Sequence, residues 1–419
     1  MTNPIDYTEV KGVDEDVYNA LQQELKRQET TLELIPSENL ASRAVMEAQG
    51  SILTNKYSEG YPGRRYYGGN EHVDVIEQLA IDRAKQLFRA EHANVQPLSG
   101  AVMNIATFFA LLNPGDTILG MDLGHGGHLT HGHPVTHMYK VFNFVRYKTD
   151  LENEGVIDYE NLREMALKHK PKLILAGFSA YSKTLDWKKF KAIADEIGAY
   201  TMADVSHISG LIAADVLENP LDCGFDIMTT TTHKSLRGPR GGLILCKEKH
   251  KKAIDKAIFP GLQGGPLEHV IAAKAVAFKE ALDPSFKKYS QDVVDNAKAI
   301  ERGLKEEGIT ICFNTTENHL LLLDLRPQKV TGKQVELTLD ELGICCNKNA
   351  IPDDDTSPMN PNGLRIGTPF ITSRGLNEEE CEELGRQIGR VINNIEDEQT
   401  HTQVRAFVKE MCEKYPIYQ

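Results

Sequence analysis

The feature that most constrains the fold is an alternation of short apolar runs and helical stretches between about residue 73 and residue 245. VIEQLAIDRAKQLF repeats apolar residues at helical spacing, with Leu79 and Leu87 on one face. KLILAGFSA and AYTMADVSH are compact apolar runs, and the helical pattern between them ends at Gly198. Such strand–helix–strand alternation predicts a mostly parallel sheet with helices on both faces.

Polar residues gather where these strands end. FDIMTTTTHK and RGGLILCK supply two further expected strands. Ligands of open parallel α/β sheets bind beyond the carboxyl ends of the strands. The residues expected at such ends are Asp204, His207, His233 and Lys234.

A second, smaller α/β unit is expected towards the C-terminus. Residues 267 to about 308 have a helical pattern broken near Pro284. HLLLLDLR and GLRIGTPF then predict two strands with a helix between them, and a final helical region starts at Asn377. The predicted organisation is an N-terminal helical arm (1–35), a large domain (36–280) and a small C-terminal domain (281–419).

The composition narrows the class of partner and compartment. A formal charge of −13 argues against nucleic acid as the main partner, because phosphate backbones require a basic face. No apolar run is long enough to span a membrane, and the polar N-terminus resembles no secretory signal, so a cytoplasmic location is expected. Seven cysteines without a C-x-x-C favour reduced thiols.

Lys234 and Asp204 form the first candidate pair. Lys234 follows four threonines and a histidine and precedes a glycine-rich turn. A solvated surface lysine does not require such neighbours. A lysine near cationic or apolar neighbours can form a Schiff base with a carbonyl compound. Pyridoxal phosphate (PLP) also needs a carboxylate at its pyridine nitrogen, and Asp204, one crossover earlier, is the expected partner.

Two further segments could serve a phosphorylated cofactor. Ser99 and Gly100 precede an apolar helix whose free amides and dipole favour a phosphate, although most such starts are ordinary helix caps. HGGHLTHGHPVTH holds five histidines, which invites a metal. Its spacing matches no helical metal motif, and an imidazole stacked on a cofactor ring explains one histidine equally well, so no metal is expected.

The loop NKYSEGYPGRRYYGG and the strand residue Arg365 complete the candidates. The loop combines tyrosine hydroxyls with Glu59, a possible acid or base. Arg365 lies in an otherwise apolar strand, where a guanidinium needs a partner: a substrate carboxylate, or an internal acidic side chain.

Together these segments resemble the serine hydroxymethyltransferase family of PLP enzymes, which has the aspartate aminotransferase-like fold. The resemblance runs from SEN (37–39) to GTP (367–369) and rests on NKYSEGYPGRRYYGG, HGGHLTHG, FSAYS, TTTTHKSLRGPRGG, PGLQGGP and LRIGTP in this order. It implies fold type I, with a mostly parallel sheet of seven strands flanked by helices in the large domain.

The resemblance also implies roles for individual residues. Lys234 would hold PLP covalently, Asp204 would face the pyridine nitrogen, and His128 would stack on the ring. The other cofactor positions are Ser99, Gly100, Ser179, His207, Tyr57, Gly264 and Gly265, the last three from a neighbouring subunit. The proton-transfer positions are Glu59 and Tyr67, and His233 is placed beside Lys234 among the catalytic groups. The substrate positions are Ser37 and Arg365 for the amino-acid carboxylate, and Leu123, Gly127, Leu129, Asn349, Ser357, Pro358 and Met359 for folate.

The implied reaction transfers the hydroxymethyl carbon of serine to tetrahydrofolate, the co-substrate, and leaves glycine. The implied assembly is a homodimer, or a dimer of dimers, with shared sites. Three positions differ from the family pattern: Pro36 and Ser206 replace alanine, and Met359 replaces an aromatic residue.

Other readings remain open from the residues alone. A threonine-aldolase-like or aminotransferase-like enzyme would need Lys234 and Asp204 but not the folate positions. A histidine-rich metal hydrolase and a non-catalytic binding protein are alternatives of a different class.

Overall fold

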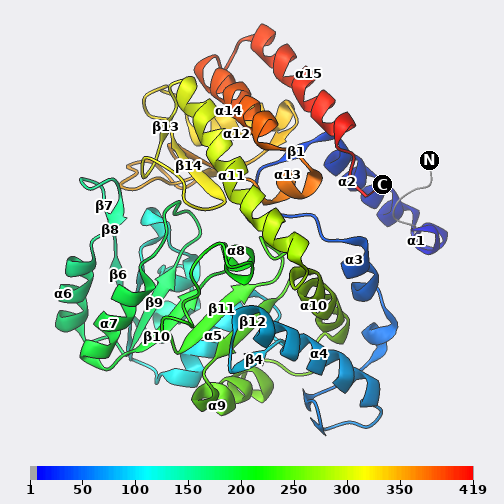
Figure 1. Cartoon of the computed structure of the whole chain (residues 1–419), viewed down its shortest axis with the longest axis vertical. Coiled ribbons are helices and arrows are strands. Elements are labelled where there is room, and N and C mark those ends of the chain that lie inside the picture. The colour runs from blue at the N-terminus through cyan, green and yellow to red at the C-terminus, as the bar shows by residue number, and fades with distance from the viewer. Residues whose placement is uncertain (1–6, 419) are drawn as a thin grey trace. The chain divides into compact units, whose positions relative to one another are not determined.

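The computed structural model describes residues 7–418 (Figure 1); residues 1–6, which begin the predicted arm, and residue 419 lie outside this part. The chain forms two compact units. One comprises Ala41–Gln291 and Phe313–Asn318; the other comprises the chain before Ala41, Asp292–Cys312 and the chain from His319 onward. The division falls within helix α11 (Pro284–Glu306).

A seven-stranded sheet forms the centre of the first unit. Its spatial order is β4 (His92–Asn94), β12 (Gly242–Cys246), β11 (Ile227–Thr231), β10 (Tyr200–Asp204), β9 (Leu173–Gly177), β5 (Thr117–Met121) and β6 (Asn143–Tyr147). Strand β12 is antiparallel to both neighbours, and the other neighbouring pairs are parallel. The predicted fold class, with a mostly parallel sheet, is confirmed.

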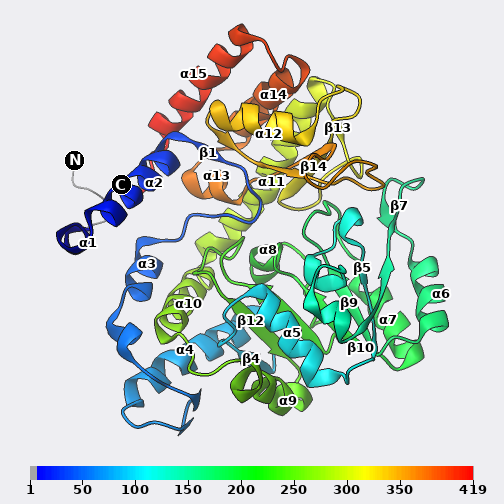
Figure 2. The ribbon, with the colours of Figure 1, turned by 180° about the vertical axis from the view of Figure 1, so that it is seen from behind.

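Helices pack along this sheet because each carries an apolar side. Helix α5 (Gly100–Leu111) packs on β11 and β12, α7 (Trp187–Ile197) on β9 and β10, and α6 (Tyr159–His169) on β6 and α7 (Figure 2). Helix α7 begins at its cap Asp186, whose side chain accepts from the amide of Lys189, and ends at Gly198 with φ 68°. The remaining helices are α3 (Arg43–Gln49), α4 (Glu71–Phe88), α8 (Ser209–Ala213), α9 (Lys251–Lys256) and α10 (Glu268–Ala281).

Short elements connect them. The two-stranded pairs are β2 (Gly60–Tyr61) with β3 (Arg64–Arg65) and β7 (Thr149–Asp150) with β8 (Val156–Ile157). The short helical segments are η1 (Ile52–Asn55), η2 (Leu123–His125), η3 (Leu129–His131), η4 (His137–Lys140), η5 (Glu248–His250) and η6 (Ala257–Leu262), the last kinked at Phe259 and Pro260.

Helix α4 differs in one detail from the pattern of its sequence, which placed Leu79 on the apolar face of the helix. Leu79 is 41% exposed, whereas Glu77 in the same helix is buried. Glu77 tolerates burial because Arg65 and Gln96 both donate hydrogen bonds to it.

The second unit contains a four-stranded antiparallel sheet in the order β13 (Thr310–Ile311), β14 (Leu320–Asp324), β17 (Gly363–Gly367) and β16 (Asn347–Asn349). Strand β1 (Leu32–Glu33) pairs in parallel with β15 (Ile344–Cys345). The helices are α1 (Thr8–Val13), α2 (Glu15–Thr30), α12 (Gly332–Glu341), α13 (Pro369–Arg374), α14 (Glu378–Asn393) and α15 (Glu398–Lys414). Within residues 7–418, none of the helices has the length and apolar character required to cross a membrane.

Candidate functional site

Two neighbouring parallel strands bring Asp204 and Lys234 to the same edge of the large sheet. Asp204 ends β10 and is in register with Thr229 of β11. Strand β11 ends at Thr231, and Lys234 follows three residues later. Both side chains are buried, with 6% and 8% of their residues exposed. A carboxylate and an amine therefore follow adjacent strands at the edge where the sequence predicted a site.

Four hydrogen bonds hold the carboxylate of Asp204. Its Oδ1 accepts from the amide of Ser206 (3.1 Å) and from the Ser206 hydroxyl (2.6 Å). Its Oδ2 is 2.8 Å from the donor Nδ2 of Asn104 and 3.2 Å from Nε2 of His131. Ser206, one of the positions that differ from the family pattern, thus donates two hydrogen bonds to the carboxylate of Asp204, two residues before it.

The hydrogen bonds around His131 fix its tautomer. Its Nδ1 accepts from the backbone amide of His128 at 3.2 Å, so its Nε2 carries the proton that it donates to Asp204. Burial by itself would raise the pKa of Asp204. The hydrogen bond from His131 opposes burial most strongly, and the electrostatic influence of the His131 and His128 imidazoles and the Ser206 hydroxyl add to it, so that the pKa of Asp204 lies below its ordinary value. Asp204 is therefore an anion at neutral pH.

Asn104 is a site residue that the sequence reasoning missed. It is fully buried in α5, and its Nδ2 donates to Asp204 and to Thr130 (2.9 Å), while its Oδ1 accepts from Thr229 (2.9 Å). The available signal was an amide in the otherwise apolar helix GAVMNIATFFAL. Asn104 links α5, the histidine-rich segment and β11 around the one carboxylate.

The turn after β11 fixes the position of Lys234. The Lys234 carbonyl accepts from the amide of Arg237 (3.0 Å), and the Gly238 amide donates to Thr232 (2.7 Å). Arg237 has a left-handed backbone, φ 57°, and its guanidinium lies 4.2 Å from the centre of the Tyr289 ring. The turn is therefore anchored from both its backbone and a side chain.

His207 and His233 flank the same turn. The hydroxyl of Ser235 donates to the carbonyl of His207 at 3.1 Å, which ties the end of β10 to the residue after Lys234. Burial, and next the charges of Lys234 and Arg240, lower the pKa of His233 to about 3. His233 is consequently neutral, and its Nδ1 accepts from the Gly241 amide (3.4 Å).

The start of α5 is suited to an anion. The Ser99 hydroxyl caps the helix by accepting from the amide of Val102. A Cβ on Gly100 would lie 2.9 Å from Cγ2 of Thr231, so only glycine fits against the end of β11. The backbone amides that open this helix thus lie close to the strand that leads to Lys234.

The HGGH and FSAYS segments are also brought together. The amide of Ser179, just after β9, donates to the carbonyl of Gly126 at 2.7 Å. A Cβ on Gly127 would collide with the carbonyl of Met121, which explains the second glycine. His128 Nδ1 shares a hydrogen bond with the Thr130 hydroxyl (2.8 Å). Of the three predicted folate positions here, Gly127 is buried, Leu123 is half-buried and Leu129 is 43% exposed.

The NKYSEGYPGRRYYGG loop forms a second group in the same unit. The rings of Tyr57 and Tyr67 contact edge to face, with centroids 5.1 Å apart. The charge of Glu59, which also hydrogen-bonds Tyr57, raises the pKa of that phenol. A Cβ on Gly264 would lie 3.3 Å from Glu59 Oε1, and one on Gly265 would lie 3.3 Å from the Tyr57 ring. Five predicted site residues are therefore clustered around this loop.

The remaining predicted residues belong to the other unit. Arg365 lies on β17 and donates from Nε to the neutral amide of Asn347 (3.1 Å), while burial lowers the pKa of Arg365 to about 10. The half-buried Ser37 follows Pro36, which packs directly on Gly367 at the end of that strand.

The predicted folate positions in this unit lie at the end of β16 and in the connection from β16 to β17. Asn349 ends β16 and is in register with Gly363. Ser357, Pro358 and Met359 are exposed in the connection to β17, with Met359 75% exposed.

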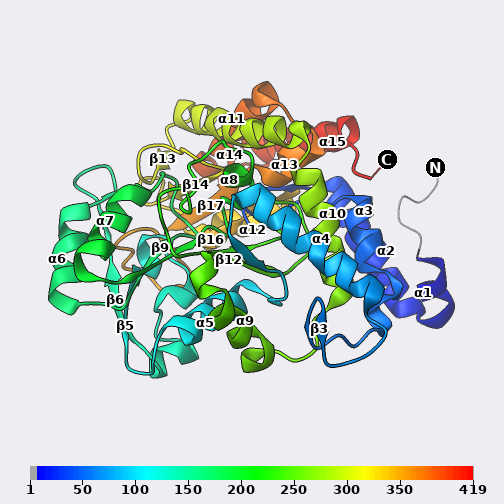
Figure 3. The same cartoon turned by 60° about the horizontal axis from the view of Figure 1, so that its bottom comes forward.

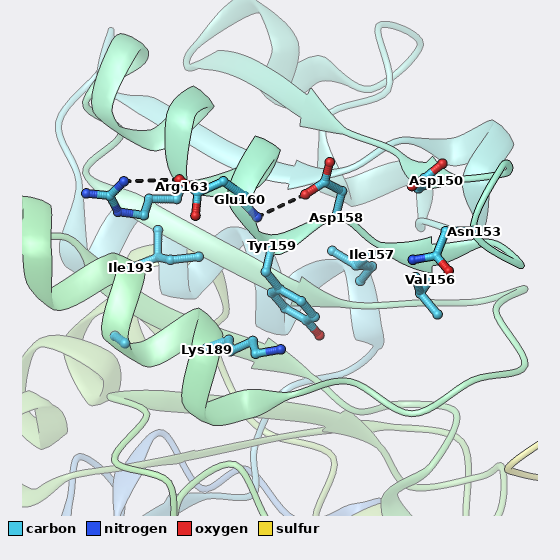
Figure 4. A pocket seen from close by; sticks show the side chains of 11 residues that line it. Asp150, Asn153, Val156, Ile157, Asp158, Tyr159, Glu160, Arg163, Lys189 and Ile193 are labelled. Carbon is cyan, nitrogen blue, oxygen red and sulfur yellow. Dashed lines mark hydrogen bonds and ion pairs between the residues drawn. The ribbon is translucent and has the colours of Figure 1, made fainter.

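Two other features of the first unit are distinct from these groups. A hollow of about 850 Å³ lies between α6, α7 and the β7–β8 pair (Figure 4), but its cationic groups already have partners, since Arg163 pairs with Glu160 and Lys189 with Asp186. Atoms of His128, His131 and Asp204 that could bind a metal lie within 4.8 Å of one another. Both ring nitrogens of His131 are already hydrogen-bonded there, to His128 and to Asp204.

The residues at the sheet edge fit PLP: a buried carboxylate held as an anion, a buried lysine that follows the next strand, and a helix start whose glycine packs closely on the end of that strand. Comparison with known families agrees. The family model described as serine hydroxymethyltransferase matches residues 10–388 of this chain.

Proposed function

Because this chain belongs to the serine hydroxymethyltransferase family, a family of PLP-dependent enzymes with tetrahydrofolate as co-substrate, we propose that it reversibly transfers the hydroxymethyl carbon of serine to tetrahydrofolate. The products are glycine and 5,10-methylenetetrahydrofolate. The observation that best supports this proposal is Asp204, a buried carboxylate that four donors hold as an anion beside the strand leading to Lys234.

PLP, when bound, supplies an electron sink for the negative charge left on the amino-acid α-carbon. Lys234 would hold it covalently, Asp204 would keep its ring nitrogen protonated, and His128 would stack on the ring. Its phosphate would bind at Ser99 and Gly100, where the first amides of α5 provide donors. Ser179 and His207 would contact the remaining polar edge of the ring.

Substrate handling falls to the other predicted residues. Arg365, with Ser37, would bind the serine carboxylate and orient the amino acid, an effect of positioning. Glu59 would accept the proton of the serine hydroxyl, and Tyr67 would assist that transfer. The predicted folate positions are Leu123, Gly127, Leu129, Asn349, Ser357, Pro358 and Met359.

A homodimer with shared sites would explain the cluster of predicted site residues around the NKYSEGYPGRRYYGG loop. We expect Tyr57, Gly264 and Gly265 of one subunit to complete the PLP site of its partner. Their clustering within one chain, together with the exposure of Tyr57 (57%), supports this arrangement.

Absorption spectroscopy of the purified protein tests the proposal. A visible band that borohydride abolishes would identify a lysine–PLP linkage, and a colourless protein with tightly bound metal would instead favour a hydrolase. Serine cleavage is then measured with and without tetrahydrofolate. Cleavage that is indifferent to folate would assign the protein to the aldolase-like alternative.

A further inference from the structure

A buried pair of glutamates, Glu77 on α4 and Glu268 on α10, lies outside the proposed chemistry. The two helices pack side by side (Figure 3). The two side chains are 1% and 0% exposed. Arg65 Nη2 is 2.5 Å from Oε2 of Glu77 and 3.6 Å from Oε1 of Glu268, so one guanidinium faces two carboxyl groups. Two carboxylates this close in a buried site are not both stable as anions.

The hydrogen bonds indicate which carboxyl group is protonated. Both oxygens of Glu77 accept from donors: Oε2 from Arg65, and Oε1 from Gln96 Nε2 at 2.8 Å. Glu268 Oε1 accepts from the hydroxyl of Ser58 at 2.6 Å. Glu268 Oε2 is buried and has no donor or acceptor when both groups are taken as carboxylates. A proton on Glu268, donated to Glu77, gives this oxygen a partner.

We infer that Glu268 is a protonated acid that donates to Glu77, and that this carboxyl pair positions Glu59 for proton transfer from serine. The inference rests on the proposed function for the role of Glu59 and on geometry for the proton itself. In this scheme Glu77 and Glu268 are positioning residues.

The connection to Glu59 runs through the residues on both sides of it. Ser58 donates its hydroxyl to Glu268, and the carbonyls of Ser58 and Gly60 both accept from Arg65 Nη1, at 2.8 and 3.1 Å. Gly60 has φ 100°, and a Cβ there would collide with the Arg64 carbonyl. The backbone is therefore held immediately before and after Glu59, and the carboxyl pair fixes the guanidinium that holds it.

Other charged groups surround the pair. Asp74 on α4 accepts from Arg65 Nε at 2.8 Å. Lys274 on α10 donates to the carbonyls of Val95, Pro97 and Gly242. Burial lowers the pKa of Lys274 to about 7, and the charges of Glu77 and Glu268 oppose that shift. Burial, followed by the charge of Asp255, raises the pKa of Tyr61 on β2, and the charge of Glu77 adds to this shift.

Raising the pH should release the pair. Burial, and then the charge of Glu77, raise the pKa of Glu268 to about 8. Above that pH, Glu268 loses its proton and becomes a second anion beside Glu77. The hydrogen bond between the two carboxyl groups is then lost, and Ser58 and Gly60 are restrained less tightly.

The matched variants Glu268→Gln and Glu77→Gln test the inference on the PLP-loaded enzyme. The amide in Glu268→Gln keeps both bonds, since its NH2 donates to Glu77 and its oxygen accepts from Ser58. In Glu77→Gln, by contrast, the NH2 group of the new amide must face either Arg65 or Gln96, which are both donors, so one of these hydrogen bonds is lost. We expect Glu268→Gln to retain kcat near neutral pH and to lose the decline of kcat above about pH 8. We expect Glu77→Gln to lower kcat about 100-fold with the lysine–PLP absorbance intact.

Infrared spectroscopy with isotope-labelled glutamate provides a readout independent of turnover. Because Glu33 is another buried glutamate, with a pKa that burial raises to about 7, the readout is the wild-type spectrum minus that of Glu268→Gln at the same pH. This difference should contain the carbonyl stretch of a buried carboxylic acid. Equal losses of kcat in both variants, an unchanged alkaline decline in Glu268→Gln, or a difference spectrum without that band would each overturn the inference. If the wild type instead cleaves no serine, the proposed function fails, while the infrared result still decides the position of the proton.

Discussion

The hydrogen bonds of Asn104 allow one prediction to be worked out in detail. Replacing Asn104 with alanine removes one bond to the charged Asp204 and two bonds to the hydroxyls of Thr130 and Thr229. A bond to a charged group contributes about 1.5–3 kcal/mol, and each neutral bond about 0.5–1.5 kcal/mol. The sum is about 2.5–6 kcal/mol, and because all of these partners are buried, water does not replace the lost amide.

We therefore expect Asn104→Ala to lower the free energy of unfolding by about 3 kcal/mol or more. The matched control is Thr107→Ala, one turn further along α5. Thr107 is also fully buried, but its hydroxyl donates only to the helix carbonyl of Met103 (2.9 Å). Its loss should cost about 1 kcal/mol.

Urea unfolding followed by far-ultraviolet circular dichroism, at a fixed saturating PLP concentration, measures both variants. A titration of each apoprotein with PLP then reports whether the carboxylate is still correctly oriented; we expect weaker binding only for Asn104→Ala. Equal unfolding free energies for the two variants, with equal PLP affinity, would refute the view that Asn104 holds Asp204.

Three further predictions follow from the site and from one buried ion pair. Lys234→Ala should lose the borohydride-sensitive visible band; a variant that keeps it would remove Lys234 from its proposed role. Glu59→Gln should bind PLP normally but lower folate-dependent serine turnover about 100-fold, and wild-type turnover would exclude Glu59 as the base. For Asp226, burial is outweighed by hydrogen bonds from His250 and Lys249, which lower its pKa. Because this pKa is depressed in the folded state, the stabilisation is present above the unfolded value of about 4 and is lost as the pH falls below it. Asp226→Asn should therefore be less stable at neutral pH and show a shallower loss of stability in acid titrations monitored by unfolding; an acid limb as steep as that of the wild type would contradict this.

Local sequence signals are enough to predict the large sheet and the edge at which chemistry is expected. Compact apolar runs and capped helices are local signals, since burial requires apolar strands and helix ends require capping groups. They located β9, α7 and β10 correctly, and strand order along the chain placed Asp204 and Lys234 at the carboxyl ends of strands, where ligands of such sheets bind. The motif order likewise identified the family that the family model matches over residues 10–388.

The side chains that hold the reactive groups could not be predicted in this way, because their contacts form only when distant parts of the chain come together. Asn104 and His131 contact Asp204 across 100 and 73 residues of sequence, and Glu77 and Glu268 meet across α4 and α10. Periodicity could not foresee that Glu77 is buried while Leu79 is exposed, because burial of a charge depends on partners that the local sequence does not contain. Hydrogen bonds and protonation states depend on distances of a few ångströms between residues remote in the chain, and only the folded arrangement sets those distances.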